Sequence, residues 1–205
     1  MSDITQMYGG SCFAIKGKNS VAIISDLRLG KQSITINKDF SKIYPVNNKT
    51  FLGLTLFNPD CNEIAKKMKL NAKLFELKEN KKIDPREISY YLSNFLYKKR
   101  FQPYFCNPIV CGIKRDGEPY VAGMDQIGCL DENAPFVAAG SAENSLIGVA
   151  EGLYREDMDD EELFIVASQI FLNSIDRDAL SGWGAECYLI NKDKVVVRRI
   201  RGRQD

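Results

Sequence analysis

Catalytic chemistry in this chain is limited first by a missing residue type, because none of its 205 residues is histidine. Without an imidazole there is no Ser-His-Asp triad, no Cys-His pair and no histidine-ligated zinc. A catalytic base would have to be a lysine, a carboxylate, a tyrosine, a cysteine or a chain-terminal amine. The composition therefore excludes the commonest hydrolase mechanisms but not all hydrolase chemistry.

The six cysteines are the other reactive side chains, and their spacing is typical of buried thiols. Most lie in apolar runs, and no two have the tight Cys-x-x-Cys spacing of redox and zinc motifs. Cys106 and Cys111 alone do not make a metal site. We expect free thiols in a reducing compartment, with no metal and no cofactor. The six are Cys12, Cys61, Cys106, Cys111, Cys129 and Cys187.

The charges are nearly balanced, with 28 lysines and arginines against 27 aspartates and glutamates. At this balance no bulk attraction to nucleic acid is expected. No apolar stretch is long enough for a membrane span or a signal peptide, so we expect a protein of the cytoplasm or nucleus. A basic cluster near the C-terminus is either a solvated strand edge and tail or a contact with an acidic neighbouring chain. It consists of Lys194, Arg198, Arg199, Arg201 and Arg203.

The elements that would position any site come in blocks: a β-rich segment, two helices, a second β-rich segment, two more helices and a closing hairpin. Runs of strands separated from runs of helices favour an α+β fold over an alternating α/β fold. Two antiparallel sheets packed face to face, with a helix pair outside each, would bury every apolar stripe. We therefore predict a four-layer αββα sandwich in a single domain spanning residues 1–205. The expected strands are 11–15, 21–24, 34–36, 42–46, 50–54, 108–113, 119–124, 128–130, 136–139, 185–190 and 194–198, with 128–130 and 136–139 extending the second sheet.

Each of the four helices has a start signal. Asp60 and Glu63 have the spacing of a capping box and begin a helix that runs to about Leu77. Pro85 opens the second helix, and Gly140–Ser141 caps the third. Four acidic residues at 159–162 favour the positive end of the fourth helix dipole. The residues expected to face the sheets are Cys61, Ile64, Ala65, Met68, Ala72 and Phe75; Ile88, Tyr91, Leu92, Phe95 and Leu96; Leu146, Val149, Ala150 and Leu153; and Leu163, Val166, Ala167, Ile170, Phe171 and Ser174.

Three motifs, in order and with matching spacing, resemble those of one protein family. Residues 10–17 (GSCFAIKG) and 21–28 (VAIISDLR) are similar to the start of a proteasome beta subunit, where a threonine and an apolar strand precede Val-x-x-Ala-Ala-Asp-x-Arg. Lys42 follows the next extended segment, as the family's lysine does, and residues 178–182 (DALSG) resemble its Asp-Ala-x-Ser-Gly motif. The resemblance covers nearly the whole chain and implies the N-terminal-nucleophile hydrolase fold.

Further segments are similar to the non-catalytic, beta-three-type branch of that family. They are residues 8–10, 39–43, 74–79, 96–101 and 176–179. Membership would imply assembly with other alpha and beta proteasome subunits in a 28-subunit, four-ring barrel of the cytoplasm and nucleus. The resemblance thus implies a structural part in ATP- and ubiquitin-dependent protein degradation, with neither nucleic acid nor membrane as a partner.

The position of the nucleophile decides whether such a chain is itself an enzyme. Active members attack with an N-terminal threonine hydroxyl whose own α-amine, with an ordinary pKa near ~8, manages the proton. Counting back from Asp26 without gaps places Gly10 there. Ser11 should point to the opposite face of the strand, and Cys12 lies about 6–7 Å along it. We expect a chain that is inactive by itself; the alternative is an active threonine-type peptidase subunit, which needs a nucleophile that Gly10 does not provide.

Other residues match positions around the nucleophile of active members. Asp26, Lys42 and Asp178 match a charged network and Ser181 a nearby serine, whereas Ala139–Gly140 lies where active members carry Ser-Gly, so a hydroxyl is missing. We interpret the set as fold support, because a buried charged cluster is costly to dismantle one partner at a time. The expected inactive-site remnants are Gly10, Asp26, Lys42, Ala139, Asp178 and Ser181.

Three segments remain. Residues 1–9 are expected to stay in place as a short, unprocessed N-terminal extension, and residues 201–205 form a C-terminal tail. In the family, the loop matching residues 124–129 leans into the substrate cleft of the adjacent catalytic subunit. The resemblance thus implies that Asp125 and Cys129 line that pocket; the alternative is a plain surface turn between strands.

Overall fold

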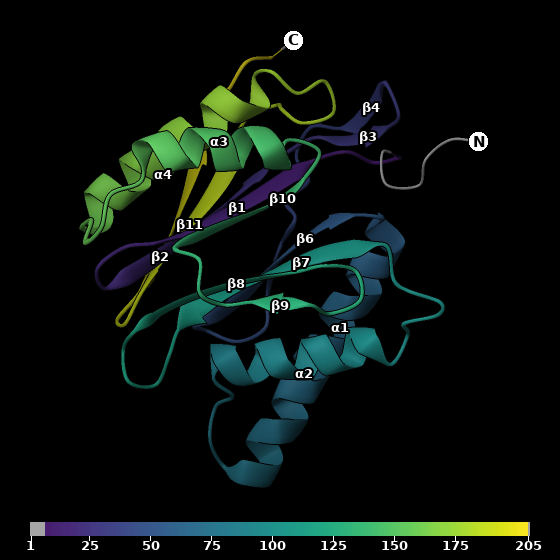
Figure 1. Ribbon diagram of the computed structural model, residues 1–205, viewed down its shortest axis with the longest axis vertical. Helices are drawn as coiled ribbons and strands as arrows, with labels where there is room; N and C mark the ends of the chain where they lie inside the picture. Colours follow the sequence, from purple (N-terminus) through teal and green to yellow (C-terminus); the bar gives the residue numbers. More distant parts are fainter. Residues whose placement is uncertain (1–6, 205) are drawn as a thin grey trace.

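The computed structural model describes residues 7–204 and has four layers, with two antiparallel sheets stacked between two pairs of helices (Figure 1). The first sheet has the order β10-β1-β2-β11-β12, and the second has the order β5-β6-β7-β8-β9. A separate small hairpin is formed by β3 and β4. The strands are β1 (Ser11–Lys16), β2 (Ser20–Asp26), β3 (Leu29–Lys31), β4 (Ile34–Asn37), β5 (Ile43–Pro45), β6 (Thr50–Leu56), β7 (Cys106–Ile113), β8 (Pro119–Met124), β9 (Leu130–Asp131), β10 (Phe136–Gly140), β11 (Ala185–Asn191) and β12 (Val195–Ile200).

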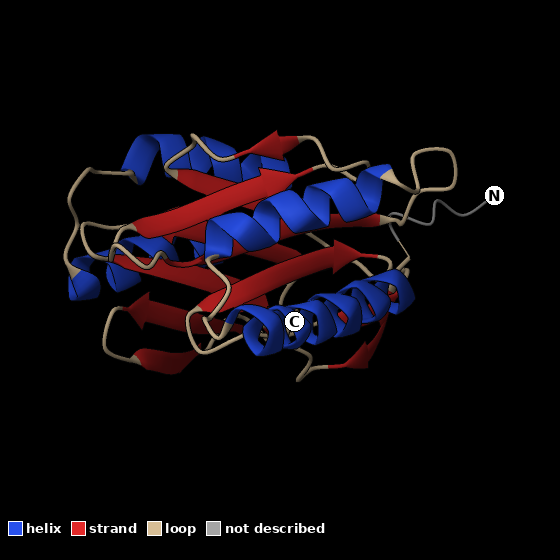
Figure 2. Ribbon diagram, turned by 90° about the horizontal axis from the view of Figure 1, so that it is seen from below, coloured by secondary structure: helices blue, strands red, loops and turns tan. Residues whose placement is uncertain are grey.

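The helices are α1 (Asn58–Glu79), α2 (Pro85–Tyr97), α3 (Glu143–Leu153) and α4 (Asp160–Ile175). Helices α3 and α4 pack on the first sheet, and α1 and α2 pack on the second. Seen from below, one helix pair lies in front of the strands and the other behind them (Figure 2). The predicted αββα sandwich is confirmed.

Both faces of the central strands are buried, and β2 shows why its middle, residues 21–24 (VAII), is apolar without alternation. Ala22 and Ile24 belong to the core beneath α3 and α4. Ile23, between them, points the other way, into the core between the two sheets. Because successive side chains of a strand alternate between faces, a strand covered on both sides is apolar at consecutive positions, and its buried polar residues Ser25 and Asp26 are hydrogen-bonded.

Helix α1 starts differently from the sequence prediction. It begins at Asn58, and its N-cap residue Phe57 makes no side-chain cap. The Asp60 carboxylate instead accepts a hydrogen bond from the Phe105 amide at 2.9 Å. A complete capping box occurs at α2, where the Asp84 carboxylate and the Glu87 side chain cap reciprocally.

Three further expectations are wrong. Strand β10 extends the first sheet, not the second, because it pairs along β1 with Ser11 opposite Gly140. The N-cap of α3 is Ala142, so the preceding serine is free for other bonds. Tyr91 and Leu153, expected to face the sheets, are 41% and 37% exposed.

Candidate functional site

A buried ion pair between Lys42 and Asp26 is the centre of the site. The two side chains are 2.7 Å apart, with only 3% of Lys42 and none of Asp26 exposed. The Lys42 ammonium also donates to the carbonyl oxygens of Arg28 at 2.9 Å and Asp26 at 3.2 Å. Three donors on an ammonium thus meet three close oxygens, and the charge is fully compensated.

The second partner, Asp26, is held at the end of β2 by backbone amides. Its Oδ1 accepts from the Ser11 amide at 3.0 Å, and its Oδ2 accepts from the Gly182 amide at 3.1 Å. Lys42 enters from the segment before β5, where its own amide donates to the Ser25 hydroxyl at 3.0 Å. The carboxylate therefore joins β1, β2 and the segment after α4 at one point.

Two consecutive glycines, Gly9 and Gly10, precede β1 with backbone φ angles of 64° and 95°; Gly9 lies against Leu180, and Gly10 lies against Lys42. The Gly10 amide donates to the Leu180 carbonyl at 3.0 Å, and its carbonyl accepts from the Ser141 amide at 3.1 Å. A Cβ on Gly10 would overlap Lys42 Cε and lie 2.8 Å from its Nζ. The backbone at Gly10 is thus aimed at the ammonium, with no room for a side chain.

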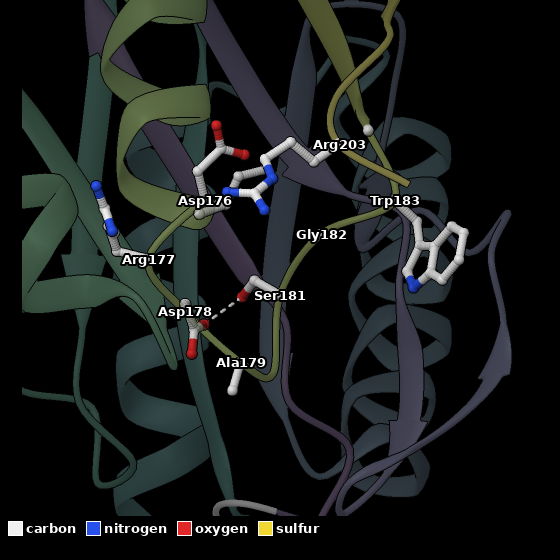
Figure 3. A pocket seen from close by; sticks show the side chains of 10 residues that line it. Asp176, Arg177, Asp178, Ala179, Ser181, Gly182, Trp183 and Arg203 are labelled. Atoms are coloured by element: carbon white, nitrogen blue, oxygen red, sulfur yellow. Dashed lines mark hydrogen bonds between the residues drawn. The ribbon is translucent and has the colours of Figure 1, made fainter. Parts of the chain in front are cut away.

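A second cluster is built from hydroxyl groups around Asp178. One carboxylate oxygen accepts from the Ser141 hydroxyl and from the Ser181 hydroxyl, each at 2.6 Å. Figure 3 shows the Ser181 bond beside a cleft of about 370 Å³ that extends to Trp183 (Figure 3). Among residues 7–204, Asp26 is the one carboxylate paired with Lys42, so Asp178 belongs to this cluster and not to the ion pair.

Ala139, which the sequence placed among the site residues, lies elsewhere. Its side chain is buried in the core between the sheets, opposite Cys12 on β1. The hydroxyl that we expect to be missing is supplied two residues later by Ser141. The sequence offers one signal for this serine, the Gly140–Ser141 pair, which we interpret there as a helix cap.

Neither Ser11 nor Cys12 is available as a substitute nucleophile. The Ser11 hydroxyl lies 2.8 Å from the Ser181 hydroxyl and accepts from the Ala142 amide at 2.9 Å, on the side of the hydroxyl cluster. Burial raises the pKa of the Cys12 thiol to about 12, although nearby Lys42 lowers it in part. A thiol with such a pKa is protonated at neutral pH and is a poor nucleophile.

Asp125 and Cys129 line a different cleft, of about 530 Å³, between β8, β10 and α3. The Asp125 carboxylate fixes the turn by accepting from the amides of Ile127 at 3.0 Å and Cys129 at 2.8 Å. Glu143 and Glu151 on α3 line the opposite wall. Burial raises the pKa of the Glu143 carboxyl. The cleft thus has an acidic rim, and Cys129 is the exposed cysteine of the chain.

Part of the C-terminal basic cluster pairs within the chain. Arg198 forms an ion pair with Glu161 of α4, and Arg199 pairs with Asp39 at 3.0 Å and Glu186 at 3.2 Å. Within residues 7–204, no group of three or more Cys, Asp and Glu side chains is arranged to hold a metal ion. In that same range, no helix is both long and apolar enough to cross a membrane.

Comparison with known proteins identifies similar sequences over the full length of the chain. A model of the family described as "Proteasome subunit" matches residues 7–190. The chain is 43% identical over 206 residues to "Proteasome subunit beta type-3" of Saccharomyces cerevisiae, covering 100% of both chains. It is 41% identical to "Probable proteasome subunit beta type-3" of Schizosaccharomyces pombe, covering 98% of this chain and 99% of the relative. A relative from Dictyostelium discoideum, also named "Proteasome subunit beta type-3", is 42% identical over 96% of this chain and 97% of its own.

Proposed function

The chain belongs to the proteasome subunit family, and on that premise we propose that it is a non-catalytic structural subunit of the proteasome core particle. It takes part in ATP- and ubiquitin-dependent protein degradation by occupying its place in the particle, not by cleaving peptides. Relatives named beta type-3 support this assignment over that of an active threonine-type peptidase subunit.

One observation carries the inactivity: the residue that faces the Lys42 ammonium is a glycine. A nucleophile there needs an oxygen or sulfur atom near the ammonium, and Gly10 has neither. Its amide donates to the Leu180 carbonyl and its carbonyl accepts from the Ser141 amide, so both of its backbone polar groups are already bonded. The ion pair and the hydroxyl cluster remain as supports that join β1, β2 and the segment after α4.

Intact-mass measurement of the chain from its native particle, after treatment with a threonine-directed covalent inhibitor, tests this proposal. We expect an unprocessed chain without adduct inside a very large assembly, while catalytic subunits of the same particle carry the inhibitor. A chain that begins at residue 10 or 11 and carries the inhibitor at this new N-terminus would overturn the proposal.

The partners that we propose are other alpha and beta subunits in a 28-subunit, four-ring barrel in the cytoplasm and nucleus. Exposed leucines on α1 support a buried position in an assembly. Leu70, Leu74 and Leu77 are 57%, 44% and 77% exposed and recur at helical spacing along one face. Monomeric proteins rarely expose a continuous apolar stripe of this kind.

We further propose that the cleft at Asp125 and Cys129 adjoins the substrate pocket of a neighbouring catalytic subunit. Its acidic rim would favour basic substrate side chains. Asp125→Ala should lower kcat/KM of one cleavage specificity of the assembled particle, most strongly for basic substrates. Asp116→Ala, an exposed aspartate outside the cleft, is the matched control. Unchanged kinetics for every specificity would contradict the proposal.

A further inference from the structure

Glu132 begins the segment 132–135, which crosses from β9 in the second sheet to β10 in the first. Its carboxylate accepts four hydrogen bonds from side chains of α2 and β8. Arg86 of α2 binds both oxygens, with Nε at 3.2 Å and Nη2 at 2.8 Å. The hydroxyls of Tyr90 and Tyr120 each donate at 3.1 Å. One side chain therefore ties the start of the crossing segment to both α2 and β8.

The pair between Arg86 and Glu132 is both rigid and electrically compensated. Bidentate pairing of a guanidinium with a carboxylate fixes the direction as well as the distance of the contact. The hydrogen bonds from Arg86 are the main reason that the pKa of the Glu132 carboxyl lies below its ordinary value. Glu132 is therefore ionised at neutral pH, and its charge is balanced on the side of α2.

The neighbours of Glu132 in the chain line the cleft of about 530 Å³ that holds Asp125 and Cys129. They are Asp131 before it and residues 134–139 after it. Asp131 ends β9, a strand of 2 residues that pairs with β8. Because successive side chains of a strand point to opposite faces, an anchor on Glu132 behind this wall turns Asp131 toward the cleft.

Two further bonds hold the crossing segment, but neither ties it to α2. The Lys16 amide of β1 donates to the Pro135 carbonyl at 2.9 Å, which fixes the far end of the segment. The Asn133 amide donates to the Asp131 carboxylate at 3.1 Å, which is a bond within the turn. The orientation of the whole turn relative to the second sheet thus depends on Glu132.

We propose that Glu132 is a positioning residue for this cleft, which holds the end of β9 so that the Asp131 carboxylate faces the same space as Asp125. The ligand class is a cationic side chain, lysine or arginine, attracted by the two carboxylates. Glu132 makes no contact with that ligand and acts through Asp131. Its consequence for cleavage rests on the proposed function of the cleft as part of a neighbour's substrate pocket.

Labelling of the Cys129 thiol in the full chain tests the positioning, because Cys129 lines the cleft and the other cysteines are buried. The ratio of its labelling rates with a cationic and a neutral methanethiosulfonate measures the negative charge that faces the cleft. Arg86→Ala is the decisive variant, because its charge change alone would raise this ratio. Loss of the anchor should instead lower the ratio roughly threefold, the effect of one charge at several ångströms in water.

Arg198→Ala breaks an exposed ion pair outside the cleft and should leave the labelling ratio unchanged. Asp131→Ala should lower the ratio as Arg86→Ala does, and the double variant should lower it no further than Asp131→Ala alone. An unchanged or raised ratio in Arg86→Ala would overturn the proposal. A double variant well below Asp131→Ala would overturn it too, because Arg86 would then act through another group.

Kinetics of assembled particles separate this inference from the proposed function of the cleft. Arg86→Ala should raise KM for a basic fluorogenic peptide at an unchanged kcat, because the attraction acts equally on bound substrate and transition state. A lowered labelling ratio with unchanged KM would leave Glu132 as the positioning residue and contradict the role of the cleft in substrate binding. An unchanged labelling ratio would contradict the positioning itself, whatever the kinetics.

Discussion

The Lys42 ammonium and the Asp26 carboxylate are the most costly residues of the site to separate. Both are buried, so loss of one leaves the other charged and unpaired in the interior. We expect Lys42→Ala to lower the free energy of unfolding by about 3–5 kcal/mol. Chemical denaturation of the folded chain measures this, with Lys67→Ala, which breaks an exposed pair with Glu63, as a control that changes little. Equal effects of the two variants would show that the buried pair is not a support.

A second prediction concerns Gly10, where the surrounding atoms leave no room for a side chain. Gly10→Thr should destabilise the chain, since φ is 95° there and the new Cβ would overlap Lys42. The variant should show no peptidase activity and no processing before residue 10. A fluorogenic peptide assay and intact mass on particles carrying the variant check both points. Activity above that of the parent particle at one added site would contradict the prediction.

The individual site residues differ in how far the sequence could predict them. The spacing of Gly10, Asp26 and Lys42 follows from one hairpin and its next strand, so local counting finds them together. Ser141 reaches Asp178 only because β10 pairs with β1, and this pairing between distant segments depends on tertiary packing. The sequence therefore assigns the missing hydroxyl to Ala139, although Ser141 supplies one.

Among the elements, α1 and α2 show that a capping pattern depends on its surroundings. Asp60 has the spacing of a box, but Pro59 in the first turn lets the helix begin earlier, and its carboxylate bonds elsewhere. Asp84 makes a true box and also accepts from the Arg115 amide at 2.9 Å. The sequence thus predicted both helices, but it placed the capping box at Asp60, where none forms, and it predicted α2 from Pro85 and not from the box at Asp84.

The α2 cap leads to a prediction at the element scale. Asp84→Ala should reduce the free energy of unfolding by about 0.5–2 kcal/mol, the range of lost N-caps. Asp84→Asn keeps an acceptor oxygen for the Arg86 amide and should lose clearly less. Thermal unfolding followed by circular dichroism compares the two. An equal loss in both variants would show that the charge, and not the acceptor oxygen of the cap, carries the stabilisation.

Strand β10 marks the limit of sequence reasoning about the sheets. Its residues follow β9 closely, which favours pairing within the second sheet. In the fold, residues 132–135 cross to the first sheet, and Phe136 packs on Phe13 with ring centroids 6.1 Å apart. A short apolar strand fits either sheet by periodicity, and packing against α3 decides between them.

Over the whole molecule, the two helix layers carry opposite charge. Residues 57–105, which include α1 and α2, hold eleven Lys and Arg against six Asp and Glu. Residues 141–178, with α3 and α4, hold two Arg against ten Asp and Glu. The near-zero net charge of the chain conceals this asymmetry. Because the two helix pairs are the outer layers of the fold, the basic and acidic segments lie on opposite faces of the molecule (Figure 1). Such a distribution orients association, because each layer attracts a partner surface of the opposite sign.

The α1 face gives the prediction at this scale. Lys69 and Lys73 are exposed beside the leucines of α1. The double variant Lys69→Glu/Lys73→Glu should slow incorporation of the chain into the large particle. Raised salt should reduce the difference in rate between this variant and the parent chain, because salt screens charges at the surface. Lys18→Glu/Lys49→Glu makes the same charge change outside both helix layers and should incorporate at the parent rate. Size-exclusion profiles of tagged chains measure both. If both variants incorporate at the parent rate at low salt, the basic α1 face meets no acidic partner. If both incorporate more slowly than the parent chain by the same factor, the effect comes from net charge alone.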